Sequence, residues 1–390
     1  MHESNGINGC CLTLGLTCFL PVFPCFAQVD PEQRSLLEAG YDQPLKGQGP
    51  PGVYGFYYYN KPDFCGTNVA LRLTATPVYL DSELGFKQLI SPTTDFGIHI
   101  NGGGWADSYY EVRQGKLIKA ESFDGNGGGA SLALYQLLNP GMQIPLNLVG
   151  SGGFHYATFE TADQTAGTFV LPQDQFDFFT RVGLRLAGRE PLLYPELGME
   201  LSAWYERQWR PNDQAYGFND DRSINPAVDL YWMHAEITYT FTNSGQAFSV
   251  SLTAGGSTDA DRLSAWRLGG MLPLDAEYPL MIPGYYNEEL TAKRFVHLYA
   301  YYEFPLIPSQ LFKFRIEGAT ANVEYLPGFE QGPWQSGAGC AFIVAPSNKA
   351  YKVILRYGYG FNAIRDGGKG AQSIGLLFQF DFEAPKKTSD

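Results

Sequence analysis

Strict alternation of apolar and polar residues is the feature that most constrains this chain. Successive side chains of a β-strand point to opposite faces of the sheet, so a period of two predicts strands and not helices. The same period recurs along most of the chain after residue 52. In the last run, SIGLLFQFDF, one face is wholly apolar and consists of Ile374, Leu376, Phe378, Phe380 and Phe382.

The alternating runs predict about fourteen strands. Two further stretches, ELGFKQLIS (83–91) and YYEVRQGKLIKAESF (109–123), could raise the number to sixteen. Tight turns alternate with long connections, of which 258–293 is the longest. The predicted strands are 52–59, 68–80, 94–105, 129–138, 142–159, 173–188, 193–207, 230–242, 247–257, 294–305, 311–324, 334–345, 350–361 and 371–382.

Two architectures accommodate so many alternating strands, a soluble β-sandwich and a membrane β-barrel. Sandwich strands are typically about five or six residues long, whereas a tilted strand that spans the hydrocarbon layer needs about ten. Aromatic residues make up 15% of the chain and gather near strand ends, as the girdles of a membrane barrel do. The polar faces carry full charges, including Arg181, Arg185 and Glu200. We therefore predict an all-β, antiparallel, up-and-down transmembrane barrel in a Gram-negative outer membrane, with a secreted all-β protein as the alternative.

The N-terminal segment is expected to direct export. Residues 12–26 are apolar and end in Cys25-Phe26-Ala27, a pattern typical of signal-peptidase cleavage, although residues 1–9 contain no Lys or Arg. We expect residues 1–27 to be a signal peptide and 28–51 a short periplasmic lead-in with a short helix in PEQRSLLEAG. The barrel would then occupy 52–382, followed by a polar tail over 383–390.

The connection between two of the predicted strands contains motifs of a known family. The elements Trp266-Arg267-Leu268-Gly269-Gly270 and Met281-Ile282-Pro283-Gly284-Tyr285 precede the strand RFVHLYAYYEFPL. This arrangement resembles the bacterial surface antigen (D15-like) superfamily of outer-membrane assembly and two-partner secretion barrels, without its N-terminal periplasmic modules. The resemblance implies that the loop folds into the lumen and that an Arg at its tip meets an acidic residue of the wall. Pro283 stands where that Arg is expected, and Glu317 is the candidate acidic partner.

The composition of the same loop favours a buried position. Apolar surface left in water costs roughly 25 cal/mol per Å², and an ordinary outer loop packed on its neighbours is the alternative. We expect the lumen position to depend on a motif formed by Trp266, Leu268, Gly269, Gly270, Pro283, Gly284 and Tyr285. The apolar residues that need covering are Leu272, Leu274, Leu280, Met281 and Ile282.

The sequence contains few signals for catalysis, metal binding or nucleic-acid binding. A net charge of −13 argues against a nucleic-acid partner, and we expect no catalytic residue, no metal and no cofactor. His99, His155, His234 and His297 are expected on the lumen faces of four separate strands. We expect a barrel of the surface antigen type in contact with outer-membrane lipid. It either assists insertion or translocation of a macromolecular client, with or without a separate periplasmic partner, or is a standalone barrel of that family. A passive diffusion channel for small polar solutes is the alternative, and the position of residues 258–293 distinguishes the two.

Overall fold

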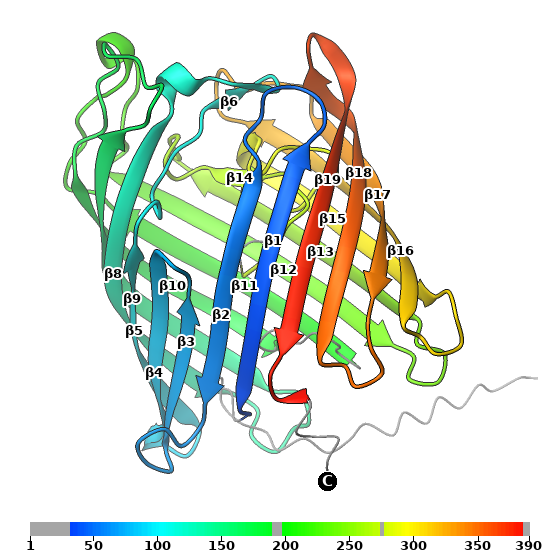
Figure 1. Ribbon diagram of the computed structural model, residues 1–390. Helices are drawn as coiled ribbons and strands as arrows, with labels where there is room; N and C mark the ends of the chain where they lie inside the picture. The colour runs from blue at the N-terminus through cyan, green and yellow to red at the C-terminus, as the bar shows by residue number, and fades with distance from the viewer. Residues whose placement is uncertain (1–31, 189–196, 274–276, 385–390) are drawn as a thin grey trace, which may run out of the picture.

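A computed structural model describes residues 32–188, 197–273 and 277–384 of the chain. They form a closed antiparallel β-barrel (Figure 1), which confirms the predicted fold class. The expected signal peptide lies outside the described residues. The sixteen strands of the wall are β1 (Arg34–Pro44), β2 (Gly52–Lys61), β3 (Val69–Ala75), β4 (Tyr79–Ser91), β5 (Thr94–Gly103), β8 (Phe123–Leu137), β9 (Leu146–Thr161), β10 (Gln175–Ala187), β11 (Leu197–Trp209), β12 (Ala227–Thr240), β13 (Ala247–Thr258), β15 (Leu290–Pro305), β16 (Phe312–Tyr325), β17 (Trp334–Val344), β18 (Tyr351–Arg365) and β19 (Gly368–Asp381).

The barrel begins earlier in the chain than predicted. Strand β1 lies where we expected a lead-in with a short helix, so that expectation was wrong. It pairs with β2 on one side and with β19 on the other, and the register with β19 runs from Leu36 opposite Asp381 to Pro44 opposite Ser373. This pairing joins the two ends of the sheet, and a closed barrel leaves no unpaired strand edge in the membrane.

The other added strand is β4, which includes the stretch 83–91 and pairs with β3 and β5. The alternative stretch, 109–123, does not supply a wall strand. It contains the two-residue strands β6 (Val112–Arg113) and β7 (Lys116–Leu117) and the short 3-10 helix η1 (Lys119–Glu121), and only its last residue begins β8. No helix among the described residues is long and apolar enough to span a membrane.

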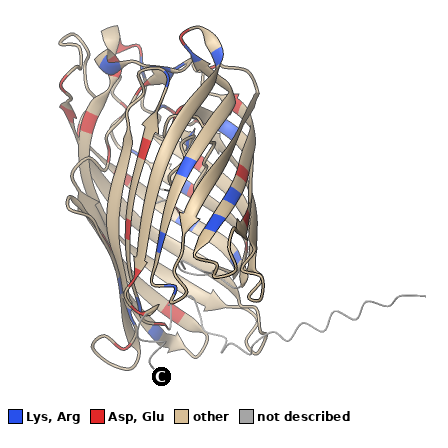
Figure 2. Ribbon diagram, turned by 45° about the vertical axis from the view of Figure 1, so that its right-hand side comes forward, with Lys and Arg blue, Asp and Glu red and all other residues tan. Residues whose placement is uncertain are grey.

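The two faces of the wall differ as the alternation predicted. Charged residues occur along many strands (Figure 2), but those at the centres of the strands point into the lumen. On β18, for example, Leu355 is 56% exposed on the outside while its neighbour Arg356 is 3% exposed on the inside. The same contrast separates Leu298 from His297 on β15. An outward apolar belt around a polar interior is the arrangement of a membrane barrel.

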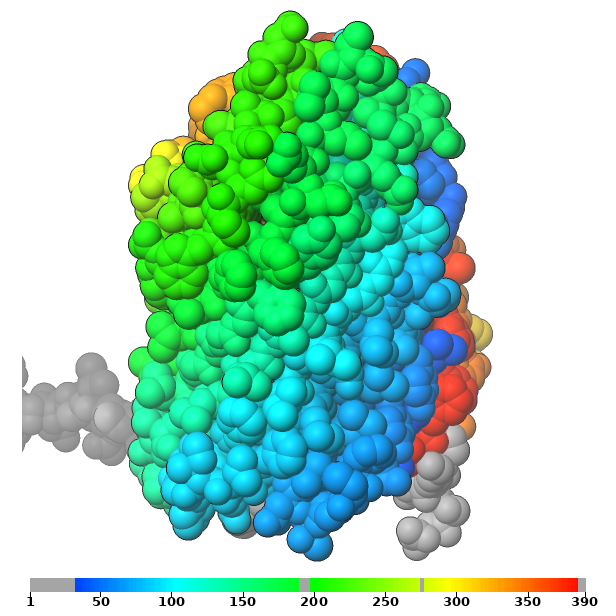
Figure 3. Space-filling view, turned by 90° about the vertical axis from the view of Figure 1, so that its left-hand side faces the viewer, coloured from blue at the N-terminus to red at the C-terminus, as the bar shows by residue number. Residues whose placement is uncertain are grey.

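The two ends of the barrel also differ. The ends of the described chain lie at the lower end in Figure 1, where most connections are short. Long connections lie at the opposite end, and a space-filling view shows them gathered over that rim (Figure 3). Short turns face the periplasm in barrels of this type, so the long connections mark the outer end. A cluster of apolar side chains holds these outer connections together, namely Tyr109, Phe123, Phe169, Tyr216 and Ile224.

Candidate functional site

The connection between β13 and β15 turns back into the barrel (Figure 1). Its first part contains the short strand β14 (Trp266–Leu268), which pairs with the start of β15. A bridge between Gly270 and Ile282 then brings the two arms of the connection together. We call residues 266–290 the crossing segment. Of its apolar residues, Leu268, Met271 and Ile282 are fully buried, and Leu274 lies outside the described residues.

One side of the crossing segment is bound to strands β15 to β19 and to β1. The backbone N–H of Met271 donates to Asp42 Oδ2 on β1 at 3.0 Å. The carbonyl of Met271 accepts a hydrogen bond from Arg356 on β18. Tyr285 donates to Gln335 on β17 at 2.7 Å. These groups all point inward from the wall, so this part of the segment lies inside the barrel.

The other side of the segment reaches a different part of the wall through Tyr278. Its hydroxyl lies 2.8 Å from Glu200 Oε1 and 3.3 Å from Ser202 Oγ, both on β11. Its ring stacks on His234 of β12, with 4.3 Å between ring centroids. Burial and the negative charges of Glu277 and Glu200 raise the pKa of Tyr278, so its hydroxyl stays protonated and donates to Glu200.

These two sets of contacts lie across the lumen from each other. In the order of strands around the barrel, β11 is eight positions from β1, which is half of the sixteen-stranded ring. Met271 and Tyr278 are seven residues apart, and a chain of that length can reach about 23 Å when extended. The described residues on either side of 274–276 therefore contact opposite walls of the lumen.

Glycines allow the segment to approach the wall closely. Gly284 has φ +86, a left-handed conformation that side chains with a Cβ rarely adopt. A Cβ at this position would overlap the backbone of Tyr359 and Gly360 on β18, and one at Gly337 on β17 would overlap the carbonyl of Pro283. The two arms of the segment likewise meet at Gly269 and Gly270, both with positive φ. The motif residues from Leu268 to Tyr285 are thus brought together against the wall.

Glu317 does have a basic partner, and that partner comes from the wall. Arg356 on β18 binds Glu317 on β16 through two nitrogens, at 3.0 Å and 2.9 Å, and both side chains are buried. Tyr299 donates to the same carboxylate at 2.8 Å. Because Arg356 also binds the Met271 carbonyl, one guanidinium joins the acidic residue to the crossing segment. Glu317 therefore belongs to a buried network of wall residues that also contacts the crossing segment.

A second buried pair fixes the end of the segment, and sequence reasoning missed it. Arg365 at the end of β18 binds both oxygens of Glu289, at 2.8 Å and 2.7 Å, and neither side chain is exposed. The Arg365 guanidinium also lies 3.5 Å from the ring centroid of Tyr286. A bidentate geometry with both charges satisfied is the arrangement that offsets the cost of burying them. The alternation within 350–361 ended before Arg365, so it gave no sign of this pair.

The outer end of the connection is held by acidic residues that bind several partners. Asp261 accepts two hydrogen bonds from Arg210, at 3.1 Å and 2.9 Å, and one from the backbone of Asn225. Glu111 is fully buried, accepts from Tyr109 at 2.5 Å, and pairs with arginines of three connections, Arg113, Arg222 and Arg262. The connections at the outer rim therefore form one packed layer above the crossing segment.

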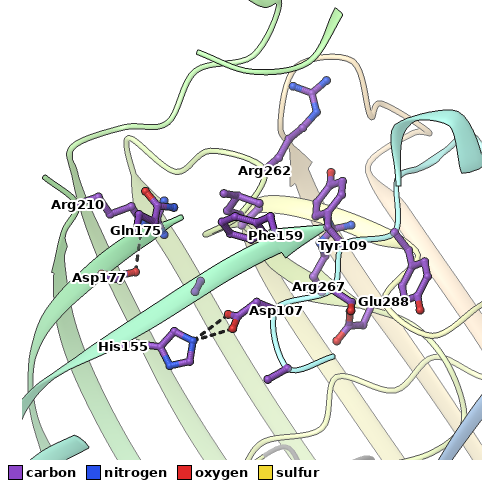
Figure 4. A pocket seen from close by; sticks show the side chains of 16 residues that line it. Asp107, Tyr109, His155, Phe159, Gln175, Asp177, Arg210, Arg262, Arg267 and Glu288 are labelled. Carbon is purple, nitrogen blue, oxygen red and sulfur yellow. Dashed lines mark hydrogen bonds and ion pairs between the residues drawn. The ribbon is translucent and has the colours of Figure 1, made fainter. Parts of the chain in front are cut away.

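Two cavities lie beside this segment. The inner one, of about 310 Å³, lies between the segment and the wall from β10 to β15 and is lined by Trp232, Trp266 and Tyr278 among others. The outer one, of about 210 Å³, lies just below the outer connections (Figure 4). Arg267 and Glu288 line both cavities. The two spaces therefore meet at these side chains of the crossing segment.

The fold and the outward apolar belt define the class of this chain as an outer-membrane β-barrel with a connection folded into its lumen. Three solved structures share the fold. CdiB from Acinetobacter baumannii is 12% identical, with a TM-score of 0.59 over 90% of this chain and 60% of that one. CdiB from Escherichia coli is 14% identical, with a TM-score of 0.56 over 90% of this chain and 64% of that one. BamA from Haemophilus ducreyi lacking POTRA domains 1-3 is 11% identical, with a TM-score of 0.52 over 89% of this chain and 71% of that one.

The comparisons confirm the expected resemblance at the level of the fold. The chain spans less than two thirds of the length of either CdiB structure. No protein-family model and no curated protein matches the sequence.

Proposed function

We propose that this barrel assists the insertion or translocation of a macromolecule at the outer membrane, and that the crossing segment closes the lumen until a client engages. The contacts of this segment with both walls carry the proposal. A chain that joins β1 and β18 to β11 obstructs the lumen at that level. The shared fold with the CdiB and BamA barrels is a second support.

The hydrogen bonds between the crossing segment and the wall favour a resting state in which the segment obstructs the lumen. Charge-assisted hydrogen bonds are roughly twice as strong as neutral ones, and the segment is held by Arg356, Glu289 and Glu200 through such bonds. On the β10 to β12 side, Tyr278 binds β11, Trp266 packs edge-on against Trp232 of β12 with 5.5 Å between ring centroids, and Glu277 lies 3.9 Å from Arg181 of β10. Release of the Tyr278 and Glu277 contacts would open a path along the inner cavity while Gly284 stays against β18.

A diffusion channel remains the second candidate because one part of the lumen wall is charged and partly exposed. On β3 and β4, Arg72 lies 3.1 Å from Glu83 and 3.7 Å from Asp81, and His99 on β5 contacts Asp81 at 2.7 Å. The side chains of Arg72 and Asp81 are 34% and 25% exposed. Small polar solutes could pass along such a surface.

A cross-link across the lumen separates the two functions. We would replace Cys65 and Cys340 with Ser and introduce Tyr278→Cys with Ser202→Cys. A short bis-maleimide would then join the segment to β11 in cells that carry this protein as their only copy. The two single-cysteine variants, treated in the same way, are matched controls.

Translocation or insertion predicts that the cross-linked cells lose one or more macromolecules from their outer membrane or medium, while the controls do not. Quantitative proteomics of both fractions measures this loss. Unchanged fractions would contradict the proposal. A diffusion channel predicts unchanged fractions together with solute uptake into proteoliposomes, measured by swelling, that exceeds the uptake into protein-free liposomes.

A further inference from the structure

The outer cavity is built by residues from several separate segments of the chain (Figure 4). Asp107 comes from the connection between β5 and β8, and His155 comes from β9. Gln175 and Asp177 lie on the inward face of β10. Arg267 and Glu288 belong to the crossing segment. A few convergent polar side chains in one cavity are a feature of ligand-binding sites.

Two buried acceptors at this cavity have no hydrogen-bond donor among the described residues. Gln175 is 6% exposed, and its Oε1 has no partner. Two residues further along the same face of β10, Asp177 uses Oδ2 to bind Arg210 at 3.2 Å, while its Oδ1 has no partner. Leaving a buried acceptor without a hydrogen bond is unfavourable, so a ligand that brings N–H donors to these two oxygens would be bound favourably.

The arginines around the cavity are already engaged. Arg210 donates to Asp177, Asp261 and Gln208. Arg262 pairs with Glu111 at 3.4 Å and lies over the ring of Phe329. Arg267 donates to Thr291 and lies 4.7 Å from the ring centroid of Tyr109. Burial raises the pKa of Tyr109 to about 12, so this phenol stays neutral.

Carboxylates complete the lining on two further sides. Asp107 contacts His155 Nε2 through both oxygens, at 3.0 Å and 2.9 Å. A Cβ at Gly127 on β8 would overlap Asp107, so the glycine there leaves room for this pair. Glu288 has φ +56 and is exposed at the edge of the cavity. The cavity thus offers free acceptors and carboxylates, which are groups that an ammonium or guanidinium group can satisfy.

We propose that the outer cavity binds a small organic cation that carries an ammonium or guanidinium group. Its N–H donors would bind Gln175 Oε1 and Asp177 Oδ1, and the carboxylates of Asp107 and Glu288 would offset its charge. The volume of about 210 Å³ is below the roughly 300–1,000 Å³ of sites for drug-sized ligands, which suits a short amine. The site does not depend on the proposed function.

Calorimetric titration of the detergent-solubilised full chain tests this proposal. The probes are 1,4-diaminobutane and agmatine, with tetramethylammonium as a cation that has no N–H donor and 1,4-butanediol as a neutral analogue. We expect the first two to bind saturably and the last two to bind at least tenfold more weakly. Equal binding of tetramethylammonium, or no saturable binding of either amine, would overturn the proposal.

Variants locate the site. Gln175→Leu and Glu288→Gln should each weaken diaminobutane binding about tenfold or more, because each removes one group that holds the cation. Asp81→Asn, on β4 and outside the cavity, removes a lumen carboxylate and should leave the binding unchanged. Glu288 is exposed, so Glu288→Gln tests the site even where Gln175→Leu fails to fold. If neither variant weakens binding, or if Asp81→Asn weakens it equally, the assignment to this cavity is wrong.

Discussion

At the scale of single residues, Gly284 is the position where the crossing segment depends most on the absence of a side chain. Its φ of +86 alone makes Gly284→Ala costly, by roughly 1–2 kcal/mol. The added Cβ would also overlap the backbone of Gly360 on β18, which cannot rotate away. Overpacking of this kind costs about a further 1–3 kcal/mol. We expect Gly284→Ala to lower the unfolding midpoint clearly, as measured by the loss of the compact, heat-modifiable band on gels.

Gly328 provides the matched control for this substitution. It has φ +88, almost the same as Gly284, but a Cβ there would meet nothing within 4 Å. Gly328→Ala should therefore show the cost of the backbone conformation without the steric cost. If both variants shift the midpoint equally, the close contact between Gly284 and β18 does not stabilise the barrel.

The network around Glu317 shows what could and could not be predicted for single residues. Alternation placed Glu317 and Arg356 on the lumen face, and the structure has both there. Their pairing depends on which strands are neighbours and in which register, and on the position of Met271 far away in the sequence. Single-sequence patterns contain neither the register nor such distant contacts, and the resemblance pointed only to a loop residue as the partner.

At the scale of whole elements, β1 is the strand that the sequence pattern did not predict. Its residues Ser35 to Ala39 contain good helix formers, and adjacent Leu36 and Leu37 do not alternate. In the barrel, Leu36 packs inward against Tyr58 while Leu37 is exposed on the outside. Pairing with β2 and β19 along nearly its whole length overrides the local propensity. Most other predicted strands agree with the structure because their two faces meet different solvents.

Ala39 provides a test of the role of β1 in closing the barrel. Ala39 lies mid-strand, opposite Gly55 on β2 and Phe378 on β19, and it is exposed on the outside. Ala39→Pro removes a backbone donor from the ladder, and proline is found in sheets essentially only on edge strands or at bulges, whereas β1 has a partner strand on both sides. We expect little or no folded barrel in refolding assays, measured as the heat-modifiable fraction.

The control at the same site is Ala39→Val. Valine keeps the backbone N–H, favours strands and faces the lipid, so it should fold as well as the wild type. A lead-in outside the barrel would tolerate both substitutions. Normal folding of Ala39→Pro would therefore show that β1 is dispensable for closure.

At the scale of the whole molecule, the barrel has lipid on one face of every strand and water or protein on the other. This two-sided environment explains why a simple period of two predicted the fold class. The same period could not predict which residues contact one another inside the lumen. The interior contains a connection whose described residues contact both β1 and β11. No local pattern encodes those distances, although the apolar residues of the connection correctly indicated that it had to be covered.

Neighbouring residues on β8 give the sharpest test of this two-sided environment. Leu132 is 53% exposed on the outside, opposite Ile98 on β5 and Gly152 on β9. Ser131 points into the lumen, with its hydroxyl 3.4 Å from His99. An arginine facing lipid costs about 2–4 kcal/mol near the centre of the membrane. We expect Leu132→Arg to lower the free energy of unfolding by about this amount, as measured by urea titration in phospholipid vesicles. Ser131→Arg should lower it much less, because the lumen there contains Asp81 and Glu83. Equal losses, or a larger loss for Ser131→Arg, would mean that water does not lie on the inner side of this wall.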